Sequence, residues 1–117
     1  MKVQTRTVDS VMIARLAGEI DAFDTEGFGE SLDAIVAAKP AVLVLDFEGV
    51  NYIASMGLSL LLRVARDMRL NGGALAIAAV TPAVKTVLDT VHLGQAIPVE
   101  PSVEAAIKRL RKSVAVG

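Results

Sequence analysis

A strand, a loop and a helix follow one another between Ala41 and Leu70, and this stretch limits the fold more than any other. An unbroken apolar run from Ala41 to Leu45 is typical of a buried strand. A polar turn through Gly49 and Asn51 comes next. Beyond it, apolar residues recur three and four positions apart, which is the period of one helix face: Leu58, Leu61, Leu62, Ala65 and Met68. The sequence therefore predicts a strand–loop–helix unit with Ser55 at the joint between loop and helix.

Ser55 at this joint has two interpretations. The first turn of a helix carries unpaired backbone N–H groups and the positive end of the helix dipole, so a phosphate on Ser55 would be stabilised there. Alternatively, the serine is an ordinary N-cap whose hydroxyl accepts a hydrogen bond from one of those N–H groups. Caps are the commoner use of a serine at such a position, and the position alone leaves both interpretations open.

Strands and helices alternate along the rest of the chain. The expected strands are Lys2–Val8, Val11–Leu16, Ala74–Val80 and Ile97–Val99, the first two joined in a hairpin at Asp9-Ser10. The other helices are expected to start at Asp24 or Thr25, at Thr81-Pro82 and at Pro101-Ser102. Their apolar patterns, which we expect to face inward, are Phe28, Leu32, Ile35 and Val36, then Val84, Val87, Leu88 and Val91, then Val103, Ala106, Ile107 and Leu110. This alternation predicts an α/β fold: a mixed, mostly parallel sheet with an N-terminal hairpin and about four helices.

A single domain is expected, because 117 residues is an ordinary domain length and no Gly/Ser linker divides the chain. We place this domain at residues 1–112 and expect a loose tail at 113–117. No apolar run approaches the roughly 20 residues of a membrane helix, and the first ten residues lack the apolar centre of a secretory signal. These features, together with the absence of cysteine, favour a cytoplasmic protein that does not insert into membranes.

The residue types needed for common enzyme sites are scarce. Without cysteine, and with His92 as the single histidine, thiolate catalysis is excluded and a metal cluster or a Ser-His-Asp triad is poorly supported. His92 follows an apolar helical pattern and precedes Gly94, which indicates a position near a helix C-terminus. The acidic residues Glu19, Asp21, Asp24 and Glu26 are typical of a solvated helix start, and an acid/base pair among them has little support. We expect no enzyme activity, no cofactor and no metal.

Charge gives little evidence of a nucleic-acid partner. The formal net charge is −1, whereas nucleic acid calls for a clustered basic surface. Arg63, Arg66 and Arg69 recur three apart on the predicted central helix. Such a stripe is either an ordinary solvated helix face or a binding patch.

The run VLDFEGVNYIASMGLSLLL, with GEID before it and TPAVKTVLDTVHLG after it, resembles a STAS domain. In particular, the chain is similar to the small stand-alone anti-sigma factor antagonists of bacteria. The resemblance extends from the N-terminal hairpin to the last helix, and its most specific part is the order of strand, Asp46, loop, Ser55, Gly57-Leu58 and helix. Members with an established switch typically read Asp before the serine, where this chain has Ala54.

The resemblance implies a protein that acts by binding. Such antagonists capture an anti-sigma factor serine kinase of the GHKL type, which frees a sigma factor for transcription. The kinase then phosphorylates a serine of the antagonist, which ends the capture, and a PP2C-type phosphatase restores it. Ser55 matches that serine, and Asp21 matches an acidic position beside the phosphorylation loop. The implied partner-binding residues are Asp21, Asp24, Asn51, Ala54, Ser55, Met56, Gly57 and Ser59.

Two other functions remain open at this stage. STAS-type subunits also bind transporter ATPases in lipid-transport systems, and Ala54 and Met56 are compatible with constitutive docking of that kind. A small-molecule or nucleotide-sensing module is the third alternative, although the sequence shows no distinctive pocket. Met56 itself is either a partner contact or a side chain that packs beneath the loop.

Overall fold

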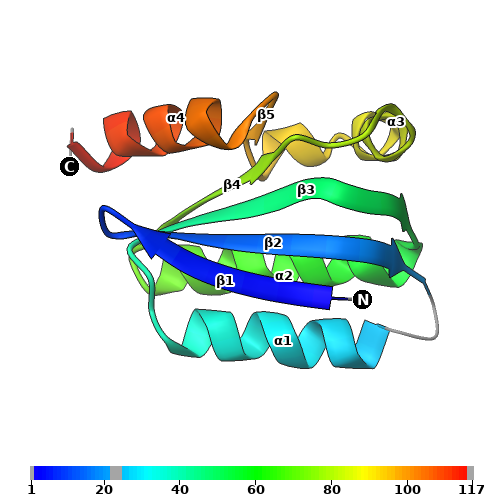
Figure 1. Cartoon of the computed structure of the whole chain (residues 1–117), viewed down its shortest axis with the longest axis horizontal. Helices are drawn as coiled ribbons and strands as arrows, with labels where there is room; N and C mark the ends of the chain where they lie inside the picture. The colour runs from blue at the N-terminus through cyan, green and yellow to red at the C-terminus, as the bar shows by residue number, and fades with distance from the viewer. Residues whose placement is uncertain (1, 22–24, 116–117) are drawn as a thin grey trace.

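The computed structural model describes residues 2–21 and 25–115. Strands and helices alternate along these residues (Figure 1), which confirms the expected α/β class. The elements are β1 (Lys2–Val8), β2 (Val11–Ile20), α1 (Thr25–Ala37), β3 (Val42–Ile53), α2 (Ser55–Leu70), β4 (Ala74–Ala78), α3 (Pro82–Thr90), the short 3₁₀ helix η1 (Leu93–Gln95), β5 (Val99–Glu100) and α4 (Val103–Ala115).

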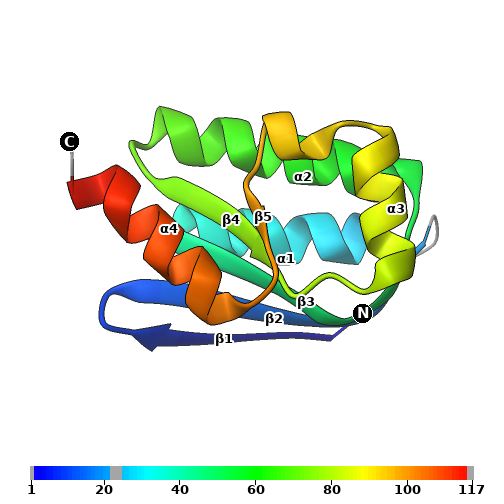
Figure 2. The same ribbon diagram turned by 90° about the horizontal axis from the view of Figure 1, so that it is seen from above.

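The five strands form one sheet in the order β1-β2-β3-β4-β5. β1 pairs antiparallel with β2, and the remaining neighbours are parallel, so the predicted mixed sheet with a hairpin at its edge is confirmed. Asp9 and Ser10 connect the hairpin with φ angles of 50° and 69°, the left-handed pair that a tight two-residue hairpin turn requires. Helices α1 and α2 cover one face, while α3 and α4 lie on the other (Figures 1 and 2).

β3 is much longer than the sequence predicted. The expected turn through Gly49 and Asn51 is wrong, because β3 continues to Ile53 and pairs in parallel with β2 as far as Ile20. The pairing includes two register shifts that polar and glycine residues accommodate. A Cβ on Gly49 would lie 3.0 Å from the Cβ of Ala17, so a larger residue would separate the two strands. The strand therefore leads almost directly into α2.

The helices bury most of the residues predicted to face inward, but Leu62 of α2 and Val91, which follows α3 and is 48% exposed, are exceptions. All four inward residues predicted for α1 are buried. In α2, however, the buried residues are Gly57, Leu61, Val64 and Met68, whereas Leu62 is 46% exposed. The apolar residues of α2 cover more of its circumference than the sheet can bury. The close contact of Gly57 with the sheet determines which of them face inward. The prediction that Leu62 belongs to the buried face was therefore wrong.

Two boundaries in the C-terminal half also differ from prediction. β4 ends at Ala78 because Ala79 adopts a left-handed conformation, with φ of 59°, that a strand cannot continue. β5 comprises Val99–Glu100, and Ile97 is buried ahead of it. α3 ends at Thr90, and His92 follows in a left-handed conformation with φ of 55°, which confirms its predicted position near a helix C-terminus.

The C-terminal helix starts where the sequence predicted. Ser102 accepts a hydrogen bond from the backbone N–H of Ala105 at 3.0 Å, which confirms the predicted start of α4. The helix then continues to Ala115, and residues 116–117 of the predicted tail lie outside the described range. Across the described part of the chain, no helix is both long enough and apolar enough to cross a bilayer.

Candidate functional site

Ser55 is the first residue of α2 and is not its N-cap. The cap position belongs to Ala54, whose φ of −86° and ψ of 165° are the extended values typical of a cap, but whose methyl side chain cannot accept a hydrogen bond. The alternative in which the Ser55 hydroxyl caps the helix is therefore wrong. The consequence is a helix that begins next to an exposed serine without any side-chain cap.

The start of α2 keeps polar groups available. No described residue accepts a hydrogen bond from the backbone N–H of Ser55 or Met56, and none is bonded to the Ser55 hydroxyl. The first free N–H groups of a helix, together with the positive end of its dipole, attract anions. Ser59, one turn along the helix, directs its own hydroxyl to the Ser55 carbonyl oxygen at 3.4 Å. An oxyanion at Ser55 would thus meet unpaired donors.

The end of β2 fixes this start of α2 in space. The backbone N–H of Ala54 donates to the carbonyl oxygen of Ile20 at 2.7 Å. The next residue, Asp21, is half-buried and lies at the same edge of the sheet as Ser55. The structure thus brings Asp21 and Ser55, predicted as neighbours, to adjacent strand ends.

Gly57 permits the close contact between α2 and the sheet. A Cβ at this position would lie 2.5 Å from Cγ2 of Ile20 and 2.9 Å from Cγ1 of Ile53. Any side chain would push the first turn of α2 away from the two strand ends. The position of the exposed Ser55 and Met56 therefore depends on a buried glycine.

Exposed apolar side chains lie close to Ser55 in the sequence and also line a groove beside it. Met56 is 58% exposed, so the alternative in which it packs beneath the loop is wrong. Sequence analysis did not identify three further exposed residues, namely Tyr52, Leu62 and Val91. A shallow groove of about 490 Å³ lies between α2 and the segment after α3, and its lining includes Ser55, Leu58, Ser59, Leu62, Val91 and His92. Large apolar side chains at a surface are a common feature of protein-binding sites.

The remaining residues of the predicted partner-binding set take different positions. Asn51 and Ser59 are exposed, and Ala54 is partly buried. Gly57 is buried, and its role is to allow the close contact between α2 and the sheet. Asp24 lies outside the described residues.

Two of the three arginines in the stripe on α2 form ion pairs. Arg63 binds Asp33 of α1 at 2.8 Å, and Arg66 is 3.4 Å from its neighbour Asp67. Arg69 forms no salt bridge with any described residue. The stripe is therefore a solvated face that also ties α2 to α1.

Over residues 2–21 and 25–115, no three histidine or acidic side chains gather where they could hold a metal ion. His92 is exposed at the turn after α3. The groups available at this site are instead the Ser55 hydroxyl, the Asp21 carboxylate, the free backbone N–H groups at the start of α2 and the nearby exposed apolar side chains.

Comparison with known proteins shows which family this chain matches. A family model described as the STAS domain matches residues 2–106. The chain is 32% identical over 106 residues to BtrV of Bordetella bronchiseptica, named as a candidate anti-sigma factor antagonist, with 91% of each chain covered.

Solved structures share the fold. A crystal structure of an anti-sigma factor antagonist from Mycobacterium paratuberculosis has a TM-score of 0.87 at 24% identity, covering 94% of this chain and 93% of the other. The anti-sigma factor antagonist SpoIIAA in its unphosphorylated form has a TM-score of 0.75 at 24% identity, covering 95% and 97%. SpoIIAA of Bacillus in its phosphorylated form has a TM-score of 0.68 at 22% identity, covering 94% and 100%.

Proposed function

Because the chain belongs to the STAS domain family, we propose that it is an anti-sigma factor antagonist, which acts by binding and not by catalysis. In this proposal it captures an anti-sigma factor serine kinase of the GHKL type and so regulates sigma-factor-dependent transcription. Phosphorylation of Ser55 by that kinase ends the capture, and a PP2C-type phosphatase restores it. The name of the relative BtrV and the antagonist names of the structural neighbours support this role.

The observation that carries the proposal is that Ser55 is exposed and its hydroxyl is free, with no partner among the described residues. The residue stands at the uncapped start of α2. A kinase could reach such a hydroxyl without unfolding the domain. That SpoIIAA, a protein of the same fold, exists in a phosphorylated form supports the same modification here.

The effect of phosphate should differ between the free domain and the complex. A phosphoserine brings a charge of about −1.5 to −2, and a helix N-terminus stabilises a nearby anion by about 0.3–2 kcal/mol. The free domain should therefore stay folded. Against a partner surface without a matching cation, the same group would cost on the order of 3 kcal/mol, or roughly a hundredfold in affinity.

The proposed docking surface is centred on Ser55. It comprises the residues predicted from sequence, Asp21, Asp24, Asn51, Ala54, Met56, Gly57 and Ser59, and adds the exposed apolar side chains Tyr52, Leu62 and Val91. Apolar side chains at its centre would supply affinity, and Ser55 would supply the switch.

Intact-mass analysis of the protein purified from its own host tests this function. We expect a mass gain of one phosphate that disappears in Ser55→Ala and persists in Ser59→Ala, an exposed serine one turn along the same helix. Protein that stays unmodified after incubation with ATP and the host's GHKL-type kinases would contradict the switch. It would favour constitutive docking, for example on a transporter ATPase.

A further inference from the structure

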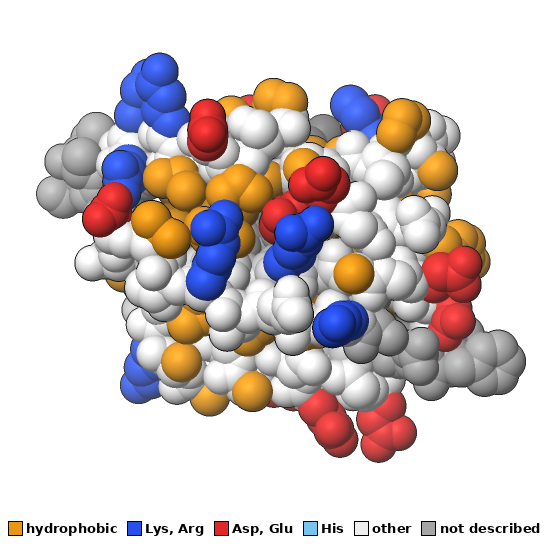
Figure 3. All heavy atoms as spheres, in the orientation of Figure 1, with side chains coloured by type: hydrophobic (Ala, Val, Ile, Leu, Met, Phe, Trp, Pro, Cys, Tyr) orange, Lys and Arg blue, Asp and Glu red, His pale blue; other side chains and the backbone are white. Residues whose placement is uncertain are grey.

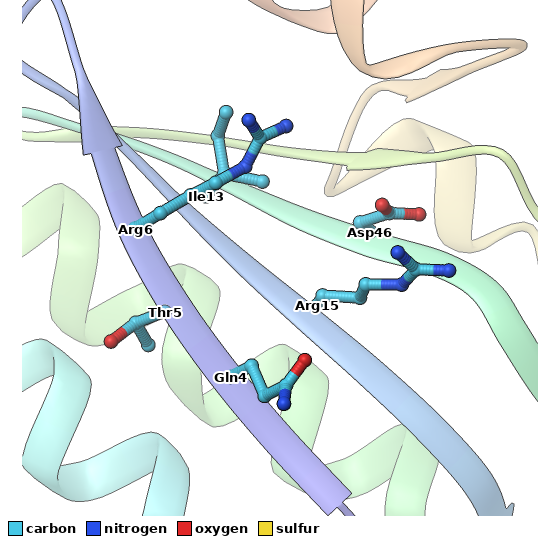
Figure 4. A pocket seen from close by; sticks show the side chains of 6 residues that line it. All are labelled: Gln4, Thr5, Arg6, Ile13, Arg15 and Asp46. Atoms are coloured by element: carbon cyan, nitrogen blue, oxygen red, sulfur yellow. The ribbon is translucent and has the colours of Figure 1, made fainter.

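A polar pocket lies on the other side of the molecule's sheet from α1 and α2. Its volume is about 770 Å³, and six residues of β1, β2 and β3 line it: Gln4, Thr5, Arg6, Ile13, Arg15 and Asp46 (Figure 4). Helix α4 packs on β4 and β3 and leaves much of β1 and β2 uncovered (Figure 2). Figure 3, which views the molecule from the β1 edge of the sheet, shows basic and acidic side chains together near the middle of the view, beside an apolar patch.

Strand register places three charged side chains on this one face. Arg6 pairs with Ile13, and the next residue of β2 on the same face is Arg15, so the two arginines are diagonal neighbours within reach of each other's long side chains. Arg15 is in turn the register partner of Asp46 in the parallel neighbour β3, at a strand spacing of about 4.8 Å. In Figure 4 all three side chains project to the same side of the sheet.

Neither arginine of the pocket is held by an acidic side chain. Four other arginines of the chain form ion pairs, namely Arg63, Arg66, Arg109 and Arg111. Arg6 and Arg15 form none with any described residue, although both are exposed and Asp46 is close in register. Two guanidinium groups on one face thus keep all of their donors for another molecule.

Asp46 gives the pocket a buried acceptor. It is 7% exposed and is the one charged side chain in the core among the residues that the structure describes. Its Oδ1 accepts a hydrogen bond from the backbone N–H of Glu48 at 3.0 Å, while no described residue donates to Oδ2. No fully buried side-chain oxygen of the described residues lacks a hydrogen-bond partner, so Oδ2 is open to the pocket, where a charged donor would find a free carboxylate oxygen.

We propose that this pocket binds a small organic anion that also carries an ammonium or another N–H donor. The carboxylate or phosphate of the ligand lies between the guanidinium groups of Arg6 and Arg15, which match the geometry of such anions. The donor of the ligand reaches Oδ2 of Asp46. Gln4 adds an amide that can donate or accept. The pocket volume is in the range of small-molecule sites. This inference does not depend on the proposed role of Ser55.

Amide chemical-shift titration of the full chain tests the anion half of the site. With inorganic phosphate as the probe, and chloride at equal ionic strength as the blank, we expect saturable shifts centred on Arg6 and Arg15. Arg6→Gln and Arg15→Gln should each weaken binding by about tenfold, because each removes a charge-assisted contact. Arg69→Gln, which changes another arginine without a described ion pair, should leave binding unchanged. Shifts that fail to saturate at tens of millimolar, or that Arg69→Gln reduces equally, would overturn the proposal.

A matched pair of dicarboxylates tests the donor half. L-glutamate and glutarate differ only in the ammonium group, and we expect the protein to bind glutamate about tenfold more tightly. Asp46→Asn should abolish this preference, since it removes the carboxylate while its amide oxygen can still accept from Glu48. An unchanged thermal unfolding midpoint checks that this variant is folded. Equal affinity for the two probes in the original protein would refute a role for Asp46 in binding.

Discussion

The backbone N–H of Ala54 donates to the carbonyl oxygen of Ile20 at 2.7 Å, and this hydrogen bond joins the start of α2 to the end of β2. Asp21 and Ser55 are the next residues on either side of that bond. Their proximity is thus determined by the sheet, because β2 and β3 stay paired up to Ile20 and Ile53. The proposed docking surface is preorganised before any partner arrives, which lowers the entropic cost of binding.

Gly57→Ala should destabilise the domain. Its Cβ would lie 2.5 Å from Cγ2 of Ile20, so α2 must shift or Ile20 must leave its rotamer, at a cost of about 1–3 kcal/mol. Gly27→Ala is the matched control, because nothing lies within 4 Å of its Cβ position in α1. That change should stabilise the domain by about 0.5–1 kcal/mol. Urea unfolding of both variants measures the difference, and equal unfolding free energies would contradict the close contact.

Ala54→Ser should stabilise the domain by about 1 kcal/mol. Ala54 already has the backbone angles of an N-cap but lacks an acceptor, and serine would supply one to the first turn of α2. The reverse change is Ser102→Ala, which removes the existing cap of α4 and should cost a similar amount. Both free energies of unfolding come from urea titration. A destabilised Ala54→Ser protein would show that the start of α2 does not tolerate a cap.

Thr81→Val should cost about 1–2 kcal/mol. The Thr81 hydroxyl donates to the carbonyl oxygen of Val50 at 3.1 Å and accepts from the N–H of Val84 at 3.5 Å, so it links α3 to β3. Thr86→Val is the control, because its hydroxyl bonds only within the exposed face of α3, to the Pro82 carbonyl oxygen. The control should change the free energy of unfolding by less than about 0.5 kcal/mol. Similar losses for both variants would argue against a tertiary role of Thr81.

The fold was largely predictable from sequence because its helices have clear periods and start signals. Thr81-Pro82 and Ser102 mark helix starts through local chemistry that operates in any tertiary context. The length of β3 was not predictable, since Gly49 and Asn51 are turn residues by local preference. They become strand residues only through pairing with β2, in which β3 carries one extra residue at each of the two register shifts, and this is a long-range effect.

The candidate site was predictable only in part, for the same reason. Ser55 stands at a junction between two elements and can be found from periodicity alone. Leu62 and Val91 look like core residues in their own helical patterns, and only the packing of α2 on the sheet shows that they are exposed. The pocket of Arg6, Arg15 and Asp46 combines three strands whose register no local pattern reveals.

Ser55→Asp should reduce binding to the partner kinase by roughly a hundredfold, because the added charge would be buried against the docking surface without a matching cation. The fold should survive, since the carboxylate meets the free N–H groups at the start of α2. Ser59→Asp is the control for charge on the same helix, and it should weaken binding less because Ser59 lies one turn from the helix start. Calorimetric titration of the kinase measures the affinities, and circular dichroism checks folding. A Ser55→Asp protein that binds as tightly as the original would show that charge at this residue does not control capture.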